Sequence, residues 1–303
     1  MVLRRVLLTG ASGMVGRHIL AELVRRNIAV VASSRTPPAG LPEKSTYARW
    51  DLAEWWDPAR FTAEFGSVDA IIHAGARVPL PSEQVPTCVS FDSNVRACLA
   101  LGSWATANGI PLLFISGSTV YKDAFKIGIK ETDELSPLGF GGFYGFTKLL
   151  GEQSLLHLTG HGLTCSILRA SSIYGAGLDA KKVPSAFLAT AARGEAIELT
   201  PSVDDRVDLI HAADVARAAV DALEQEAWGI FNIANGHPAS MLEIAETCVE
   251  VVGRGSVRLL DGDGTRKPRT RFALDCAAAQ SRFGFVPRVS LKDGLACLYQ
   301  SMS

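Results

Sequence analysis

The chain has 303 residues, of which 48% are hydrophobic and 20% charged, and its 30 basic residues nearly balance 31 acidic ones. This composition is typical of a folded globular protein that is long enough to form two lobes around a cleft. The chain contains no basic stripe with interleaved aromatic residues and no apolar run near the roughly 20 residues that span a bilayer, so we expect no nucleic-acid partner and no membrane segment.

Short apolar runs alternate with amphipathic stretches through the first half of the chain. Val15, Ile19 and Leu23 recur at helical spacing, and a second helical stretch over 94–108 ends at Gly109. This alternation predicts an α/β fold, a Rossmann-type doubly wound parallel sheet that binds ligands at the carboxyl ends of its strands. The predicted strands are Val6–Leu8, Ile28–Ala32, Ala70–His73, Leu112–Ile115 and Thr164–Leu168.

A glycine-rich turn, Thr9–Gly16, lies between the first predicted strand and the first predicted helix. Gly10 permits a tight turn, Gly13 allows the backbone to approach a pyrophosphate, and Gly16 allows the helix to lie close to the strand. The amides at the start of the helix favour bound phosphate groups. The spacing is G-x2-G-x2-G, so a simple glycine-rich turn remains an alternative to a dinucleotide-binding turn.

The second predicted strand is followed by Ser33, Ser34 and Arg35. A carboxylate in this region of a dinucleotide-binding fold accepts the ribose 2′-hydroxyl of NAD, and none is present here. A guanidinium group pairs well with phosphate, so Ser34 and Arg35 favour the 2′-phosphate of NADP over NAD. The alternative is that Arg35 is an ordinary surface residue.

Tyr144 and Lys148 are four residues apart, so they lie on one face of a helix. A free tyrosine has a pKa of about 10, and a cation beside it favours the phenolate. After a dinucleotide-type turn, the pair predicts redox chemistry at a carbonyl or alcohol.

The alternation of strands and helices weakens after about Ser171, where prolines become frequent. We therefore predict a dinucleotide-binding domain over 1–170 with a return segment over 208–235, in which Gly229–Ala234 forms a further strand. A smaller C-terminal substrate-binding lobe is predicted over 171–207 and 236–303.

The six cysteines are scattered and form no Cys-x2-Cys pair, so we expect neither a disulfide framework nor a metal site. The apolar run before the glycine turn is too short for a signal-peptide core. We therefore expect a cytoplasmic protein.

With these features in place, the chain resembles the extended short-chain dehydrogenase/reductase family, and within it the NAD(P)-dependent epimerase/dehydratase branch. The resemblance runs from the first predicted strand to Leu295. The motifs that carry it are Thr9–Gly16, Trp50–Leu52, His73–Ala76, Asn94–Val95, Ser116–Tyr121, Tyr144 with Lys148, Leu168–Gly175, Arg206–His211 with Asp214–Ala216, and Arg269 before Leu274–Asp275.

The resemblance implies hydride transfer between a nicotinamide and a substrate carbon, with Tyr144 as general acid or base. Lys148 would lower the Tyr144 pKa and bind the nicotinamide ribose. The residues expected to bind the coenzyme are Gly10, Ser12, Gly13, Met14, Val15, Ser34, Arg35, Asp51, Leu52, Ala74, Gly75, Ala76, Asn94 and Lys148.

One departure from the family pattern concerns the catalytic hydroxyl, because Gly117 occupies the usual position of a serine or threonine. We expect Ser118 to polarise the substrate carbonyl, with Thr119 as the alternative; Thr119 shares the face of Gly117 in an extended strand. A purely local role for both hydroxyls also remains open.

The expected substrate-binding residues are Ser118, Thr119, Tyr144, Ser172, Arg206 and Arg269. Ser172 replaces an asparagine that often grips the diphosphate in relatives that act on nucleotide sugars. Dehydratases carry an Asp-Glu pair where this chain has Ser118 and Thr119, so dehydration is disfavoured. We predict an NADP-dependent reductase of a keto group in a sugar nucleotide; a nucleotide-sugar 4-epimerase and a low-activity NADP-binding regulatory protein are the alternatives. The resemblance also implies a homodimer formed through the helices near 94–108 and 143–159.

Overall fold

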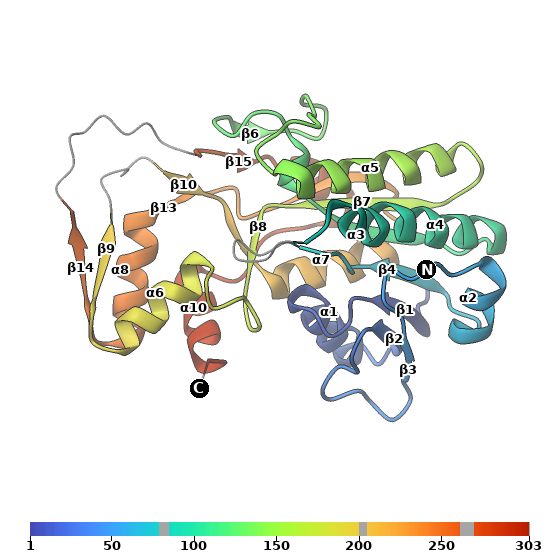
Figure 1. The fold of residues 1–303 in the computed structure, drawn as a ribbon, viewed down its shortest axis with the longest axis horizontal. Coiled ribbons are helices and arrows are strands. Elements are labelled where there is room, and N and C mark those ends of the chain that lie inside the picture. Colours follow the sequence, from blue (N-terminus) through green and yellow to red (C-terminus); the bar gives the residue numbers. More distant parts are fainter. Residues whose placement is uncertain (79–84, 200–204, 261–269, 303) are drawn as a thin grey trace.

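The computed structural model describes residues 1–78, 85–199, 205–260 and 270–302, and a seven-stranded sheet forms its centre (Figure 1). The strands are β1 (Arg5–Thr9), β2 (Ala29–Ser34), β3 (Thr46–Arg49), β4 (Ala70–His73), β5 (Leu112–Gly117), β7 (Cys165–Ala170) and β12 (Gly229–Ile233). Their order is β12-β7-β5-β4-β1-β2-β3, and every neighbouring pair is parallel. The predicted doubly wound parallel sheet is confirmed.

Helices cover both faces of this sheet. Those against one face are α1 (Met14–Arg25), α7 (Ala212–Glu224) and α9 (Ala277–Phe283), and those against the other are α2 (Pro58–Phe65), α4 (Ala97–Asn108) and α5 (Gly142–Thr159). A short helix α3 (Thr87–Phe91) and a π-helical turn η1 (Asp92–Arg96) run directly into α4. The predicted end of this helix at Gly109 is confirmed, since Gly109 has a left-handed φ of 64°.

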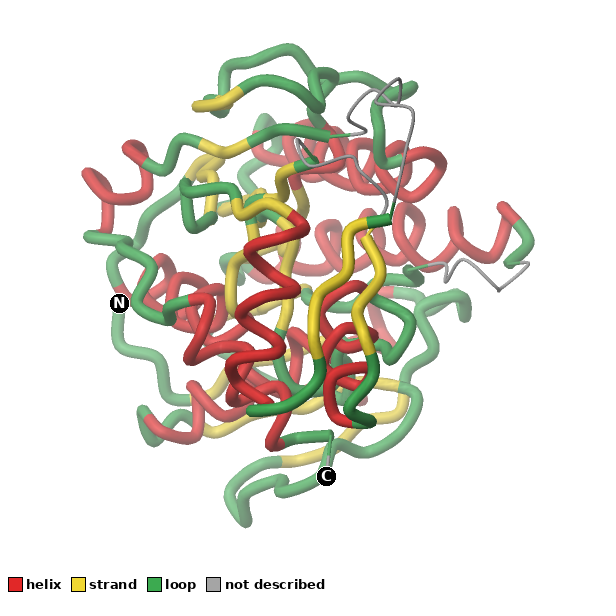
Figure 2. Tube along the Cα trace, turned by 90° about the vertical axis from the view of Figure 1, so that its left-hand side faces the viewer, coloured by secondary structure: helices red, strands yellow, loops and turns green. Residues whose placement is uncertain are grey.

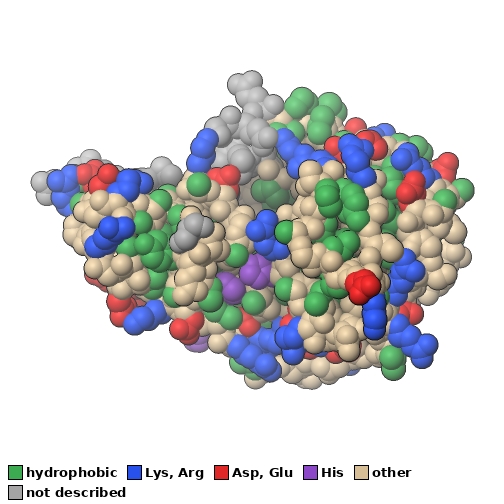
Figure 3. All heavy atoms as spheres, turned by 90° about the horizontal axis from the view of Figure 1, so that it is seen from below, with side chains coloured by type: hydrophobic (Ala, Val, Ile, Leu, Met, Phe, Trp, Pro, Cys, Tyr) green, Lys and Arg blue, Asp and Glu red, His purple; other side chains and the backbone are tan. Residues whose placement is uncertain are grey.

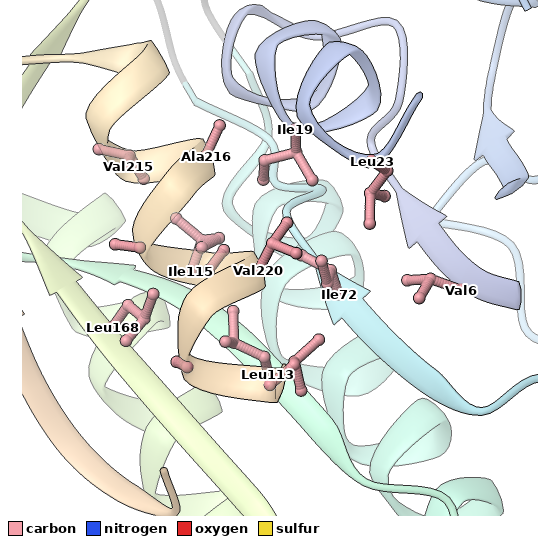
Figure 4. Packing of buried hydrophobic residues seen from close by; sticks show 14 of the residues in the cluster. Val6, Ile19, Leu23, Ile72, Leu113, Ile115, Leu168, Val215, Ala216 and Val220 are labelled. Carbon is pink, nitrogen blue, oxygen red and sulfur yellow. The ribbon is translucent and has the colours of Figure 1, made fainter. Parts of the chain in front are cut away.

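The two apolar layers arise because successive side chains of a strand point to opposite faces of the sheet. Val6 and Leu8 of β1 join the core under α1 and α7, whereas Leu7 joins the core on the other face. Figure 4 shows Ile19 and Leu23 of α1 beside Val220 of α7, above the strand side chains. Burial on both faces explains why these strands are nearly continuous apolar runs.

Five of the six predicted strands agree with observed strands to within two residues at each end, and the sixth, Ala70–His73, agrees at both ends. The return strand Gly229–Ala234 is β12, which pairs with β7 at the edge of the sheet. Strand β3 was not predicted. It has four residues, pairs with β2 alone among the described strands and is half exposed, so it lacks the apolar signal of the central strands.

A second group of elements lies beside the main sheet and has its own apolar core (Figures 1 and 2). Its helices are α6 (Val183–Ala192), α8 (Met241–Val252) and α10 (Leu291–Gln300). Helices α6 and α8 contact the parallel pair β9 (Ala196–Leu199) and β14 (Ser256–Leu259), and α10 packs against α6 and α8. That this region binds substrate, and the domain boundaries given above, remain predictions.

Smaller strand pairs connect the two groups of elements. They are β6 (Ile127–Ile129) with β15 (Ala273–Leu274), β8 (Ser172–Tyr174) with β11 (Leu209–His211), and β10 (Arg206–Val207) with β13 (Ala239–Ser240). A 3-10 turn, η2 (Ser118–Val120), directly follows β5. Among the described residues, none of the helices combines the length and the apolar character needed to cross a bilayer.

Candidate active site

The glycine-rich turn joins β1 to α1 and closes against the loop that follows β4. Gly10 has a φ of 71°, and a methyl group at this position would lie 2.6 Å from Cα of Gly75. A methyl group at Gly16 would overlap the carbonyl oxygen of Gly10. Gly13 precedes α1 and provides no side-chain cap, so the first amides of the helix stay available to a phosphate group.

An open cavity of about 290 Å³ begins at this turn and follows the carboxyl ends of β1, β2, β4 and β5 to α5. The predicted coenzyme residues that line it are Gly10, Ser12, Gly13, Met14, Val15, Ser34, Arg35, Asp51, Leu52, Ala74, Gly75, Ala76 and Lys148. From below, the molecular surface shows a recess near the middle of the face, with histidine and cationic side chains close to it (Figure 3). These thirteen residues therefore share one cavity.

The end of β2 forms one wall of the cavity. Ser34 is the last residue of the strand and Arg35 the first after it, and both line the cavity. Ser34 Oγ donates a hydrogen bond to the carbonyl oxygen of Thr36 at 2.6 Å. Ser33 also lines the cavity, and within the described part of the chain its buried hydroxyl has no hydrogen-bond partner. A polar ligand would provide such a partner.

Asn94 is the predicted coenzyme residue that does not line the cavity. Its side-chain oxygen accepts from the backbone N–H of Arg77 at 2.6 Å, and its amide donates to the carbonyl oxygen of Arg77 at 3.0 Å. The amide also donates to Thr147 Oγ1 at 2.9 Å. Asn94 therefore ties the loop after β4 to α5, and this role positions the wall of the cavity.

Tyr144 and Lys148 both line the cavity from the first turns of α5. The Lys148 ammonium donates to the carbonyl oxygen of Ile115 at 2.5 Å and lies 4.0 Å from the ring centre of Phe114. Burial lowers the pKa of Lys148 to about 8 and raises the pKa of Tyr144 to about 12. The sequence suggested that Lys148 lowers the Tyr144 pKa, but here the ammonium is held by a strand carbonyl and burial sets the tyrosine pKa.

The predicted substrate residues lie in several places. Ser118 is buried at the start of η2, and Thr119 follows it. Ser172 begins β8 and is half-buried. Arg206 of β10 makes an ion pair of 3.4 Å with Glu243 and donates to the carbonyl oxygen of Pro238 at 3.3 Å. Arg269 lies outside the described residues.

A buried ion pair beneath the site was not predicted from the sequence. Arg169 and Glu152 are 1% and 0% exposed, and Arg169 Nη2 lies 2.7 Å from Glu152 Oε2. Glu152 also accepts from Ser116, which lines the cavity, and Arg169 donates to Tyr121 Oη at 3.2 Å. Glu152 lies four residues after Lys148 on α5, and this spacing was the available signal.

The sequence model of the NAD dependent epimerase/dehydratase family matches residues 6–234, which includes the glycine turn and the Tyr144–Lys148 pair. This chain belongs to that family. The resemblance inferred from the motifs is therefore confirmed, and the protein is an NAD(P)-dependent enzyme of the extended short-chain dehydrogenase/reductase type.

Two relatives of this epimerase/dehydratase family member match over nearly its whole length. It is 27% identical to the dTDP-4-dehydro-6-deoxyglucose reductase of Escherichia coli over 98% of this chain and 97% of the relative. It is 25% identical to UDP-glucuronic acid decarboxylase 6 of Arabidopsis thaliana, over 96% of this chain and 86% of the relative.

A solved structure of MoeE5 in complex with UDP-glucose and NAD is also similar to this family member. The two have a TM-score of 0.82 and 26% sequence identity, and the match covers 98% of each chain. The relatives thus carry different activities on one fold, so the fold alone does not determine the reaction.

Proposed function

We propose that this enzyme uses NADPH to reduce a keto group of a sugar nucleotide. The observation that carries the proposal is the single cavity that has Arg35 at the end of β2 and Tyr144 with Lys148 on α5, with the glycine turn between them. A dinucleotide coenzyme bound along such a cavity would have its adenosine end near Arg35 and its nicotinamide end near Tyr144 and Lys148.

The residues present fit a phosphorylated adenosine. Gly10 and Gly16 leave no room for side chains beside the turn, and the unpartnered hydroxyl of Ser33 lies in the same wall as Arg35. No carboxylate directly follows β2, whereas the Arg35 guanidinium can pair with a 2′-phosphate. These features favour NADP over NAD.

The protonation state of Tyr144 favours reduction. When bound, the reduced nicotinamide supplies a hydride to the carbonyl carbon and is itself oxidised. The carbonyl oxygen then needs a proton, and a phenol with a pKa of about 12 is fully protonated near neutral pH. Tyr144 donates that proton, and Lys148 holds its positive charge near the phenolate that remains.

The proposed substrate class rests on the names of the relatives and on the Arg206 guanidinium. The relatives' names include a dTDP-linked keto sugar and UDP-glucuronic acid, and MoeE5 is bound to UDP-glucose. Arg206 is half-exposed at the second group of elements and makes one weak ion pair. We infer that it contacts the diphosphate of a nucleotide-linked substrate.

The second candidate is an NAD-dependent nucleotide-sugar 4-epimerase, which the NAD bound in the MoeE5 structure favours. An epimerase oxidises and then reduces the same sugar carbon, so it consumes no coenzyme overall. The two candidates therefore differ in a simple measurable quantity.

The test is coenzyme oxidation by the purified protein with dTDP-4-dehydro-6-deoxyglucose, followed by absorbance of NADPH or NADH. A reductase consumes one NADPH for each keto group reduced, and Tyr144→Phe removes the reaction without weakening NADPH binding. Interconversion of UDP-glucose and its 4-epimer without net coenzyme loss would support the epimerase instead. Binding of NADPH with no turnover of any keto-sugar nucleotide or UDP-sugar would contradict both.

A homodimer through the predicted helices accompanies this proposal. Leu99 of α4 and Phe143 of α5 are large apolar side chains that are 42% and 40% exposed, and Phe91 just before η1 is 40% exposed. Exposed apolar groups on neighbouring helices are typical of an interface. Light scattering should give twice the chain mass, and Leu99→Glu should give a monomer.

A further inference from the structure

The hydroxyl group of Ser33 lies in the wall of the cavity without a hydrogen-bond partner. Ser33 is 1% exposed, it lines the cavity, and no other residue that the structure describes pairs with its Oγ atom. Leaving a buried hydroxyl unpaired is unfavourable, and such a group in a native protein points to a missing ligand or water. The hydroxyl therefore marks a point at which the cavity can bind a polar group.

The alternation of side chains along β2 determines which way Ser33 faces. Ser33 lies on the same face as Val31, which shares an apolar core with Trp50, and Trp50 also lines the cavity. Ser34 lies on the opposite face, where its hydroxyl already donates to the carbonyl oxygen of Thr36. The two neighbouring serines thus serve different sides of the sheet, and Ser33 belongs to the side of Trp50.

The backbone of Ser33 is held against the glycine turn. Its carbonyl oxygen accepts from the backbone N–H of Ala11 at 3.2 Å, and within the sheet Ser33 pairs with Thr9 of β1 and Ala48 of β3. A group that is fixed in this way loses little conformational freedom when a ligand binds. The hydroxyl is therefore preorganised at a fixed place relative to the amides at the start of α1.

Burial separates the environment of Ser33 from that of Arg35, two residues later. Arg35 is exposed, whereas Ser33 and Trp50 are 1% and 2% exposed. A phosphate group carries charge that is costly to bury, so a 2′-phosphate is expected at the exposed guanidinium. An uncharged aromatic base can be buried beside Trp50, and the polar atoms on its edge then need partners that a hydroxyl can supply.

We propose that Ser33 binds the adenine base of the coenzyme through a hydrogen bond between its hydroxyl and the edge of the ring. This inference rests on the coenzyme site of the proposed function, but it does not depend on the reaction that follows. NAD and NADP share this base, so Ser33 contributes affinity for both, whereas Arg35 distinguishes between them.

The test measures binding rather than turnover, with NADPH, NADH, 5′-AMP and 2′,5′-ADP as probes in titration calorimetry. Ser33→Ala should raise all four dissociation constants by the same factor, about 3- to 10-fold, as expected for one neutral hydrogen bond. Without coenzyme, the variant should have a thermal midpoint about 2 °C above that of the wild type, because it lacks an unpaired buried hydroxyl. Arg35→Ala should weaken NADPH and 2′,5′-ADP alone.

The matched control is Ser166→Ala. Ser166 is a buried serine of β7 that does not line the cavity, and its hydroxyl donates to the carbonyl oxygen of Ala227. This substitution removes a hydrogen bond that the protein makes without coenzyme, so it should lower the thermal midpoint. All four dissociation constants should stay unchanged.

Unchanged dissociation constants for Ser33→Ala overturn the inference and assign the hydroxyl to water. Weakening confined to NADPH and 2′,5′-ADP also overturns it, because the hydroxyl then serves the 2′-phosphate. A lowered thermal midpoint, as in Ser166→Ala, overturns it in favour of a structural role. Binding of NADPH without oxidation by any keto-sugar nucleotide contradicts the proposed reduction and leaves this inference standing.

Discussion

The ammonium group of Lys148 donates to the carbonyl oxygen of Ile115 at 2.5 Å, on the strand beneath the helix that carries Tyr144. Lys148 thus has a strand acceptor before any coenzyme binds. Because it is buried, its charge depends on pH near the physiological range, and so does any step that needs the cation.

We expect kcat/KM for reduction to fall as the pH rises above about 8. The lowered pKa of Lys148, about 8, means that the ammonium is charged below this pH and neutral above it. Tyr144 has a pKa of about 12 and gives no limb in this range. Lys148→Arg, which keeps its charge, should remove the descending limb even if activity is lower. A profile that stays flat well above pH 8 in the wild-type enzyme would contradict this assignment.

Replacement of Arg35 should change coenzyme preference. Arg35→Ala removes the proposed partner of the 2′-phosphate, so the KM for NADPH should rise roughly 10- to 100-fold, which corresponds to a charge-assisted hydrogen bond. The KM for NADH should change little. Arg49→Ala is the control, since Arg49 ends β3 and pairs with Glu54 outside the cavity. A wild-type preference for NADH would show that the inferred specificity is wrong.

Breaking the buried pair should destabilise the fold. Glu152→Gln leaves the Arg169 guanidinium buried without a counter-charge, and we expect the free energy of unfolding to fall by about 3–5 kcal/mol. Urea denaturation measures this change. Glu250→Gln breaks the exposed pair with Lys292 and should cost at most about 1 kcal/mol. Equal effects of the two substitutions would mean that burial does not govern this pair.

Acid should destabilise the protein through His73. This residue is fully buried, and its pKa is lowered from 6.5 to about 3 by burial and by the nearby Lys148 charge. The unfolded chain therefore binds a proton that the folded chain excludes. The contribution of His73 to stability is complete above pH 6.5 and declines by about 1.4 kcal/mol per pH unit as the pH falls toward 3.

The corresponding measurement is urea denaturation of the wild type and of His73→Gln between neutral pH and about pH 5. The variant is expected to be less stable at neutral pH, because it loses the contact of 2.6 Å between Thr9 Oγ1 and the His73 ring. Its stability should nevertheless depend less on pH. Identical slopes for the two proteins would assign the acid sensitivity to other groups.

Local patterns in the sequence were sufficient to predict the sheet and many of the residues that line the cavity. Apolar runs located the central strands, and the glycine turn required the backbone geometry that Gly10 and Gly16 show. The position of Arg35 was predicted from the end of the second strand, and Arg35 directly follows β2 in the structure. These features depend on short stretches of chain, in which spacing determines geometry.

Features that depend on contacts between distant segments could not be predicted in the same way. Asn94 links two distant segments through its hydrogen bonds to Arg77 and Thr147. The position of the Lys148 ammonium likewise depends on the carbonyl oxygen of Ile115. The burial of the Thr119 hydroxyl, which has no hydrogen-bond partner among the described residues, depends on the packing of α5 against η2.

Helix α7 has a consequence for any attempt to recombine this enzyme with a relative. It follows the first stretch of the second group of elements in the chain, yet its Val215 and Val220 join Ile19 and Leu23 in one core. A gene fragment that stops at residue 170 would expose that core and leave β7 without its neighbour β12. A chimera that exchanges the second group of elements therefore needs three junctions rather than one, near residues 170, 207 and 235, so that residues 208–235 stay with residues 1–170.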